Sequence, residues 1–134
     1  MSNTKAIGVS YLDPEFSTCY ATEEIGYASA AQGTVTQATD KSTGVTLNKS
    51  AGRITMNAAS LAANTAVSFT LTNSLISTND AIIVNVSGGG TAAAYTTYIS
   101  SMAAGSAVVT LRNLTGSALA EAVVLNFAII HGAS

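Results

Sequence analysis

SLAANTAVSFTLTNSLISTNDAIIVNV, residues 60–86, returns later in the chain as SMAAGSAVVTLRNLTGSALAEAVVLNF, residues 101–127. The two copies lie 41 residues apart at both ends and 40 apart in the middle. The second copy is therefore one residue shorter in its first expected strand, a difference that a β-bulge can absorb. This repeat predicts two similar strand–loop–strand units within one domain.

Side-chain alternation inside the repeat indicates β-strands. Val67, Phe69 and Leu71 alternate with hydroxyl residues, which is typical of a half-buried strand. Residues 81–86 are nearly all apolar and predict a central strand that is covered on both faces. With the flanking β-prone segments, eight strands are expected at residues 34–37, 44–47, 53–56, 66–72, 81–86, 94–100, 107–112 and 122–130.

The expected fold class is therefore all-β. Short strands with turns between them predict an antiparallel β-sandwich, jelly-roll-like, with about eight strands and an internal pseudo-repeat. The segment 57–64 could form a helical turn capped by Asn57, but we expect a connection with Leu61 turned inward. Residues 33–134 form the expected sandwich domain, and residues 1–32 form an extended N-terminal arm.

The surface is predicted to be poor in charge. Charged residues make up 9% of the 134 residues and the net charge is −2, whereas about 25% is usual. Five Lys and Arg residues spread along the chain argue against a nucleic-acid partner. The sequence lacks the long apolar run of a transmembrane helix and the pattern of a signal peptide, so we expect a protein made in a cytoplasm, without a membrane partner. Sparse charge suits a surface covered by further copies or by a larger assembly.

Residues capable of chemistry are few. Cys19, the single cysteine, is expected to be a small buried residue. One His and one Cys far apart do not predict a metal site, and Gly88-Gly89-Gly90 predicts a turn rather than a phosphate or cofactor site.

Catalysis is not expected. A Ser-His-Asp site built from His131 with Asp80 or Glu121 is geometrically open, but no G-x-S-x-G motif supports it. A paired-carboxylate site would need Asp80 and Glu121 in one cleft. Because they occupy equivalent places in the repeat, we expect solvated loop caps instead.

The candidate functional residues belong to interfaces. Tyrosine is enriched in protein contacts, so the arm's tyrosines favour docking on a neighbour, although they could also cover the domain's own edge. Two arginines at strand ends could form contacts through their planar side chains or be ordinary surface charges. The candidate interface residues are Tyr11, Tyr20, Tyr27, Arg53 and Arg112.

The run GTVTQATDKSTGVTLNKSAGRITMNAASLAANTAVSFTLTNS, with DAIIVNVSGGGTAAAY and LRNLTGSALAEAVVLNFAII, resembles a small module of tailed-bacteriophage virion structural proteins. The likeness covers residues 33–130 and carries no catalytic motif. It implies a capsid decoration (cement) protein: an oligomeric sandwich, first a homotrimer and second a dimer, that binds the phage major capsid protein on the outside of the shell after synthesis in the host bacterial cytoplasm.

Three other functions remain open at this point. A tail- or head-fibre module binding a host receptor or glycan would expose an aromatic cluster, such as Tyr95 and Tyr98 beside the glycine turn. A small hydrolase and a lectin-like adhesive module are the others.

Overall fold

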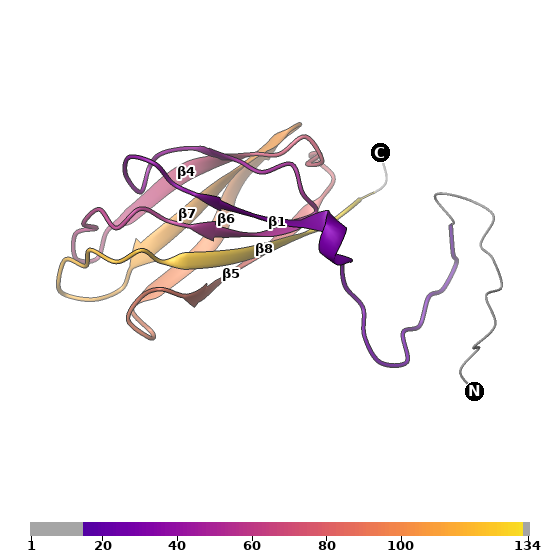
Figure 1. The fold of residues 1–134 in the computed structure, drawn as a ribbon, viewed down its shortest axis with the longest axis horizontal. Coiled ribbons are helices and arrows are strands. Elements are labelled where there is room, and N and C mark those ends of the chain that lie inside the picture. Colours follow the sequence, from indigo (N-terminus) through magenta and orange to yellow (C-terminus); the bar gives the residue numbers. More distant parts are fainter. Residues whose placement is uncertain (1–14, 133–134) are drawn as a thin grey trace.

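The computed structural model describes residues 15–132 of the chain, which form a sandwich of two four-stranded sheets preceded by an extended arm (Figure 1). Sheet A has the strand order β1 (Gln32–Thr36), β3 (Ala51–Thr55), β8 (Val124–Ile130), β5 (Ala81–Gly88). Sheet B has the order β2 (Val45–Thr46), β4 (Ala66–Thr72), β7 (Ser106–Asn113), β6 (Tyr95–Ala103). The predicted all-β sandwich with eight strands is confirmed.

Two of the strand pairs are parallel, so the sheets are mixed rather than antiparallel throughout. β1 pairs with β3, and β2 with β4, in parallel register. The reason lies in the winding: the chain changes sheet at every connection except the β6–β7 hairpin. A strand that returns to its sheet after a crossover can lie parallel to its neighbour, which a tight hairpin does not allow.

The repeat folds around a pseudo-twofold axis that passes through both sheets. In sheet B, Phe69 lies opposite Val109, its counterpart in the second copy. In sheet A, Asn85 lies opposite its own counterpart Asn126. Equivalent residues can face each other in two antiparallel pairs only if one twofold rotation relates the copies, so β4 matches β7 and β5 matches β8.

The one-residue difference between the copies falls in a turn, and the expected bulge is wrong. β4 and β7 pair without a register shift. Asn73 N–H donates to the carbonyl of Gly105, and Asn113 N–H to that of Thr65. Asn64 and Gly105 both have positive φ, 54° and 79°. The first copy therefore carries its extra residue next to Asn64, where a loop accepts an insertion at little cost.

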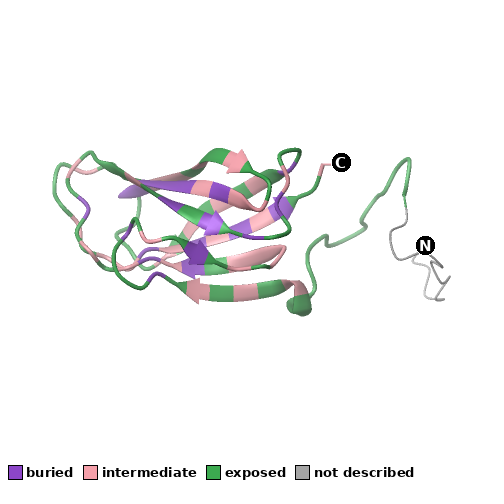
Figure 2. Ribbon diagram, turned by 90° about the horizontal axis from the view of Figure 1, so that it is seen from above, coloured by how far each residue is buried: buried purple, intermediate pink, exposed green. Residues whose placement is uncertain are grey.

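The core lies between the sheets, and along the strands buried residues alternate with more exposed ones (Figure 2). Its fully buried side chains include Ile54, Leu71, Leu111, Leu125 and Ile129. Leu61 is 5% exposed and bridges to Leu119, which confirms the inward connection predicted at residues 57–64.

Gly33 and Gly52 lie opposite each other on β1 and β3. A Cβ at Gly52 would come within 2.6 Å of Leu47 Cδ2. Leu47 therefore fills the space that the two glycines leave beneath this side of sheet A.

The strand β5 is an edge strand, which contradicts the central position expected for residues 81–86. It pairs with β8 in sheet A, and the side chain of Ile83 is 56% exposed. Its counterpart β8 is central. The copies are thus alike in sequence but unlike in burial, because β3 covers one flank of β8 and the described residues form no second partner for β5.

Candidate functional site

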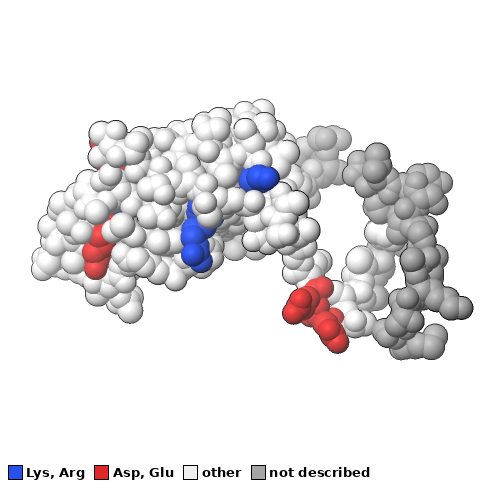
Figure 3. Space-filling view, viewed as in Figure 1, with Lys and Arg blue, Asp and Glu red and all other residues white. Residues whose placement is uncertain are grey.

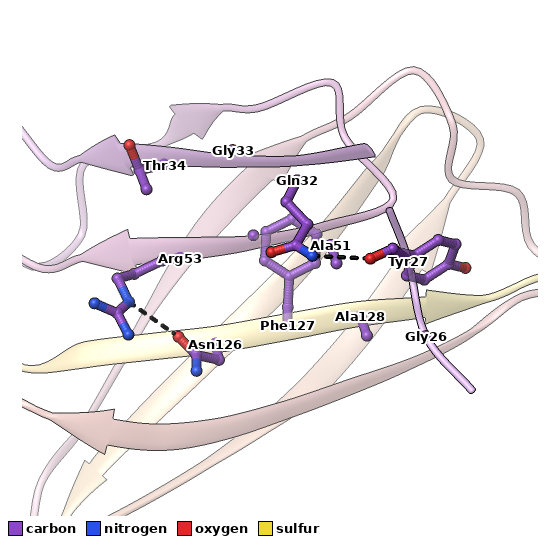
Figure 4. A pocket seen from close by; sticks show the side chains of 11 residues that line it. Gly26, Tyr27, Gln32, Gly33, Thr34, Ala51, Arg53, Asn126, Phe127 and Ala128 are labelled. Atoms are coloured by element: carbon purple, nitrogen blue, oxygen red, sulfur yellow. Dashed lines mark hydrogen bonds between the residues drawn. The ribbon is translucent and has the colours of Figure 1, made fainter. Parts of the chain in front are cut away.

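A shallow groove crosses the outer face of sheet A at the root of the arm. Its volume is about 490 Å³, and Figure 4 shows its lining side chains. It is formed by three neighbouring strands and the arm: Gly26, Tyr27, Gln32, Gly33, Thr34, Ala51, Gly52, Arg53, Asn126, Phe127 and Ala128. "The groove" below means this set.

The groove follows from small residues at outward positions of three strands. In β1, β3 and β8 the apolar side chains alternate inward, so the remaining positions face solvent. Ala51 lies opposite Ala128 and Arg53 opposite Asn126. The alanines form a floor at one end, whereas Arg53 Nε donates to Asn126 Oδ1 at 3.4 Å at the other (Figure 4).

The root of the arm is fixed at the rim of the groove. The Tyr27 hydroxyl donates to the carbonyl of Ile129. Gln32 Nε2 donates to the carbonyl of Tyr27 at 2.9 Å, and Lys49 Nζ donates to that of Ala30 at 2.9 Å. Tyr27, 37% exposed, therefore both docks on its own domain and forms one wall of the groove.

Beyond Gly26 the described arm is extended and uncovered. Residues 15–28 are all exposed and lead away from the sandwich (Figures 1 and 2). Phe16 is 61%, Tyr20 90% and Ile25 91% exposed. Cys19 is also exposed, so the expectation of a buried cysteine is wrong: it rested on cysteine's usual preference, which an arm without a covering layer cannot meet.

The structure brings together two of the five candidate interface residues. Tyr27 and Arg53 both line the groove. Tyr20 lies on the uncovered arm, and Arg112 is exposed on β7 in the other sheet. Tyr11 lies outside the described residues.

An apolar patch, which sequence reasoning missed, adjoins the groove on the same face. It consists of outward residues of two paired strands, with Ile83 opposite Ala128 and Ala81 opposite Ile130. Ile83 is 56% and Ile130 55% exposed. The apparent burial of residues 81–86 in the sequence hid this patch, because its isoleucines were assigned to a core.

The acids of the sandwich are fixed by hydrogen bonds rather than solvated as expected. Asp80, 8% exposed, accepts from Ser77 N–H at 2.8 Å, from its hydroxyl at 3.0 Å and from Gly132 N–H at 3.1 Å. The Ser77 N–H, followed by its hydroxyl, Gly132 and His131, lowers the pKa of Asp80.

His131 does meet Asp80, with 3.1 Å between Nδ1 and Oδ2. The nearby Ser77 hydroxyl, however, donates to the carboxylate itself. A hydrolytic site requires a serine that donates to the histidine, so these three side chains form a loop clasp rather than a triad.

Glu121, the counterpart of Asp80, closes the glycine turn. It accepts from Thr91 N–H at 3.0 Å, from the Thr91 hydroxyl at 2.7 Å and from the Tyr95 hydroxyl at 2.7 Å. These donors, the Thr91 N–H first, lower the pKa of Glu121. Burial, and then the bond to Glu121, raises the pKa of Tyr95. Tyr95 is 9% exposed and Tyr98 is 46% exposed, so the two do not form an exposed cluster.

Lys41 is a buried cation, which no pattern in the sequence predicts. It is 3% exposed, and its Nζ donates to the carbonyls of Asn57 and Glu121. Burial lowers the pKa of Lys41, and the negative charge of Glu121 partly opposes this. Gln37 completes the arrangement by donating to the carbonyls of Lys41 and Thr43. This network holds the β1–β2 loop to the rest of the sandwich. Because Lys41 is buried in it, the charge of this lysine is withdrawn from the outer surface.

Charge is unevenly divided between the sandwich and the arm. Figure 3 shows a mostly uncharged face on which basic side chains lie on the sandwich, while acidic side chains lie on the arm and at the end of the sandwich far from it. The described arm carries Glu15, Glu23 and Glu24 and no Lys or Arg, while Arg53 stands exposed in the groove. The exposed Arg53 of the groove and the acidic residues of the described arm therefore carry opposite charges.

Comparisons of the chain with protein-family models, with curated proteins and with solved structures gave no match. Among residues 15–132 there is no group of three or more His, Cys, Asp or Glu side chains placed to hold a metal ion. In that same part of the chain, no helix has the length and apolar character needed to span a membrane.

Proposed function

We propose that this protein is a structural component of an assembly, and specifically a decoration protein that binds the outside of a bacteriophage capsid as an oligomer and stabilises the shell. The observation that carries the proposal is the uncovered arm. Phe16, Tyr20 and Ile25 are each more than half exposed, on a segment attached firmly to a rigid sandwich through Tyr27. Large apolar side chains held outside a core are typical of contact surfaces.

Three further features support an assembly role. The surface carries few charges, so neighbouring copies meet little electrostatic repulsion. The sandwich is rigidly cross-linked by the Asp80, Glu121 and Lys41 networks. The major capsid protein, the proposed partner, would present many equivalent sites, and an oligomer that engages several of them gains avidity without a deep pocket. We propose a trimer first and a dimer second.

The test is electron microscopy of particles made with and without this protein. Outward density on the shell at symmetric positions, together with shells that rupture at lower temperature without the protein, is the expected result. Normal shells that have lost adsorption to host cells would instead support a fibre module. If particles made in the presence of this protein do not contain it, both functions are contradicted.

A receptor-binding fibre module is the second candidate, and Tyr98 is the observation in its favour. Its ring is 46% exposed on the outer face of sheet B. Beside it, the hydroxyls of Ser68, Thr110 and Ser100 form a chain with distances of 2.7 and 2.9 Å. An aromatic ring beside hydroxyls can stack on a sugar, but burial of Tyr95 removes half of the expected cluster. A glycan array comparing Tyr98→Ala with the wild type tests this candidate.

A further inference from the structure

We infer that the outer face of sheet A is the docking site for the arm of a second copy of this chain. The interaction surface consists of the groove and the adjoining apolar patch of Ala81, Ile83, Ala128 and Ile130. This inference deepens the proposed function, because it names the partner and the contact by which an oligomer would form.

The arm has the right pattern of side chains to lie on this face. In an extended chain alternate residues share a side, so Phe16, Tyr20 and Glu24 would share one side of the arm once it is straightened on a sheet. The structure gives residues 15–28 no strand or helix, and the chain bends at Ser17, Thr22 and Glu23, so docking on a sheet would straighten it. The arm can therefore present an aromatic, apolar and acidic side to a sheet.

The spacing on the arm matches the spacing on the sheet. From Tyr20 to Glu24 an extended chain spans about 13 Å. Along β8 the same four-residue step separates Asn126, which pairs with Arg53, from Ile130 in the apolar patch. An arm laid along β8 thus brings Glu24 to Arg53 when Tyr20 reaches Ile130.

Charge and polarity agree with this placement. Arg53 is exposed, with a long hydrogen bond of 3.4 Å to Asn126. A carboxylate is the partner that its planar guanidinium binds best. At the other end Ile83 and Ile130 offer apolar surface to an aromatic ring.

The position of the arm's root makes exchange between copies geometrically simple. Gly26 and Tyr27 line the groove, so each chain carries its arm at the edge of its own docking site. Residues 15–25 can reach about 35 Å when extended. Two sandwiches placed side by side can therefore each bind the other's arm and form a symmetric dimer. Three sandwiches can form a closed ring if each binds the arm of the next, which gives a trimer.

The first experiment is a charge swap followed by sedimentation equilibrium of the purified full chain. Glu24→Arg alone and Arg53→Glu alone are each expected to weaken self-association by about tenfold or more, and the double variant to recover most of it. Arg112→Glu makes the same charge change on the opposite sheet and is expected to have no effect. Glu23→Arg, on the other side of the arm, is expected to have a smaller effect than Glu24→Arg.

The second experiment uses Cys19 as a native probe for cross-linking. Wild-type chain is mixed with a Cys19→Ser, Ala81→Cys variant and treated with a bismaleimide, because Ala81 pairs with Ile130, the end of β8 to which the proposed register brings Cys19. Peptide mass spectrometry identifies the product that joins Cys19 to position 81, which must contain two chains, and separates it from the Cys19–Cys19 product of two wild-type chains. Thr70→Cys, on the outer face of sheet B, replaces Ala81→Cys as the control, and we expect the mixed product with position 81 and little of it with position 70.

Three results would overturn the inference. One is a chain that remains monomeric at all concentrations. Another is cross-linking of Cys19 to position 81 only within one chain, seen when an Ala81→Cys variant that keeps Cys19 is treated in the same way, which would mean that the arm folds back on its own sandwich. The third is an oligomer that is indifferent to both charge reversals. Since no capsid is present in either experiment, failure here leaves the capsid test independent.

Discussion

Asp80 fastens the end of β8 to the loop before β5. Its carboxylate accepts from Ser77 on one side and from Gly132 and His131 on the other. The contacts with His131 and Gly132 join residues 51 and 52 positions apart in the chain. Because the bonds favour the ionised carboxylate, they lower its pKa, and the clasp is strongest when Asp80 is charged.

We predict that Asp80→Asn reduces stability at neutral pH and flattens its dependence on acid. A carboxyl whose folded pKa lies below its ordinary 3.8 stabilises the fold above the unfolded pKa, and this contribution is lost as pH falls through the folded pKa. Urea unfolding of wild type and variant is measured at pH 7 and at about pH 2.5. The difference in unfolding free energy between the two proteins should be smaller at the lower pH.

Glu15→Gln removes the same charge from the exposed arm and serves as the control for net charge. An Asp80→Asn variant whose deficit in unfolding free energy is equal at both pH values would contradict this role for the carboxylate.

At the scale of elements, two buried asparagines close the strands β4 and β7. Asn73 and Asn113 are equivalent in the repeat, and both are fully buried. Asn113 Nδ2 donates to the carbonyls of Leu61, Ala62 and Ser117, at 3.1, 3.2 and 2.8 Å, and its Oδ1 accepts from Thr115 N–H at 2.9 Å. Asn73 has two such side-chain bonds, to Lys49 O at 2.7 Å and from Leu75 N–H at 3.0 Å.

We predict that Asn113→Ala costs about 2–4 kcal/mol of unfolding free energy, because it leaves several buried backbone groups without partners. Asn73→Ala should cost roughly half as much, since fewer groups lose a partner. Asn85→Ala, on the exposed face of β5, should stay within about 0.5 kcal/mol. If chemical denaturation shows the same loss of unfolding free energy for Asn85→Ala and Asn113→Ala, the proposed structural role of Asn113 is refuted.

The strands could be predicted from sequence because each depends on local alternation and turn residues. The alternation of Val67, Phe69 and Leu71 with hydroxyl residues predicts β4 at its observed bounds, Ala66–Thr72. Which strand lies at an edge could not be predicted, since β5 and β8 have similar sequences and differ only in what packs beside them. The parallel pairing of β1 with β3 and of β2 with β4 likewise depends on crossovers between sheets.

The candidate site was predictable only in part. Tyr27 and Arg53 were chosen for their chemistry, and the structure places both in the groove. The isoleucine patch and the buried Lys41 were missed, because an apolar strand and a lysine carry no sequence mark of unusual exposure. A signal for the asparagines did exist in TLTN and TLRN, where the same polar residue ends both copies of a strand.

At the scale of the whole molecule, the arm and the sandwich are separable in stability. The described arm up to Gly26 is exposed throughout, so it buries little surface on a single domain. Its contribution to the melting temperature should therefore arise from association between chains and should depend on protein concentration.

We predict that deleting residues 1–25 makes the melting temperature independent of concentration, whereas that of the full chain rises as the protein is concentrated. At high dilution the two should agree within about 2 °C, because residues 15–25 are exposed on the single chain and bury little surface there. Differential scanning fluorimetry over a wide concentration range measures this. A truncated chain that melts far lower even at high dilution would mean that the arm stabilises its own sandwich.

The antiparallel pairing of β5 with β8 has a practical consequence. It sets Gly88 beside Val124 at one end of β5 and Ala81 beside Ile130 at the other. The turn that follows β5 contains Ala92 and Ala93, which are both exposed. The length of the strand separates this turn from the apolar patch by about 20 Å. A foreign epitope spliced between these two alanines would project from the pole opposite the arm's anchorage. If the chain coats a particle through its arms, that pole is the natural point for antigen display.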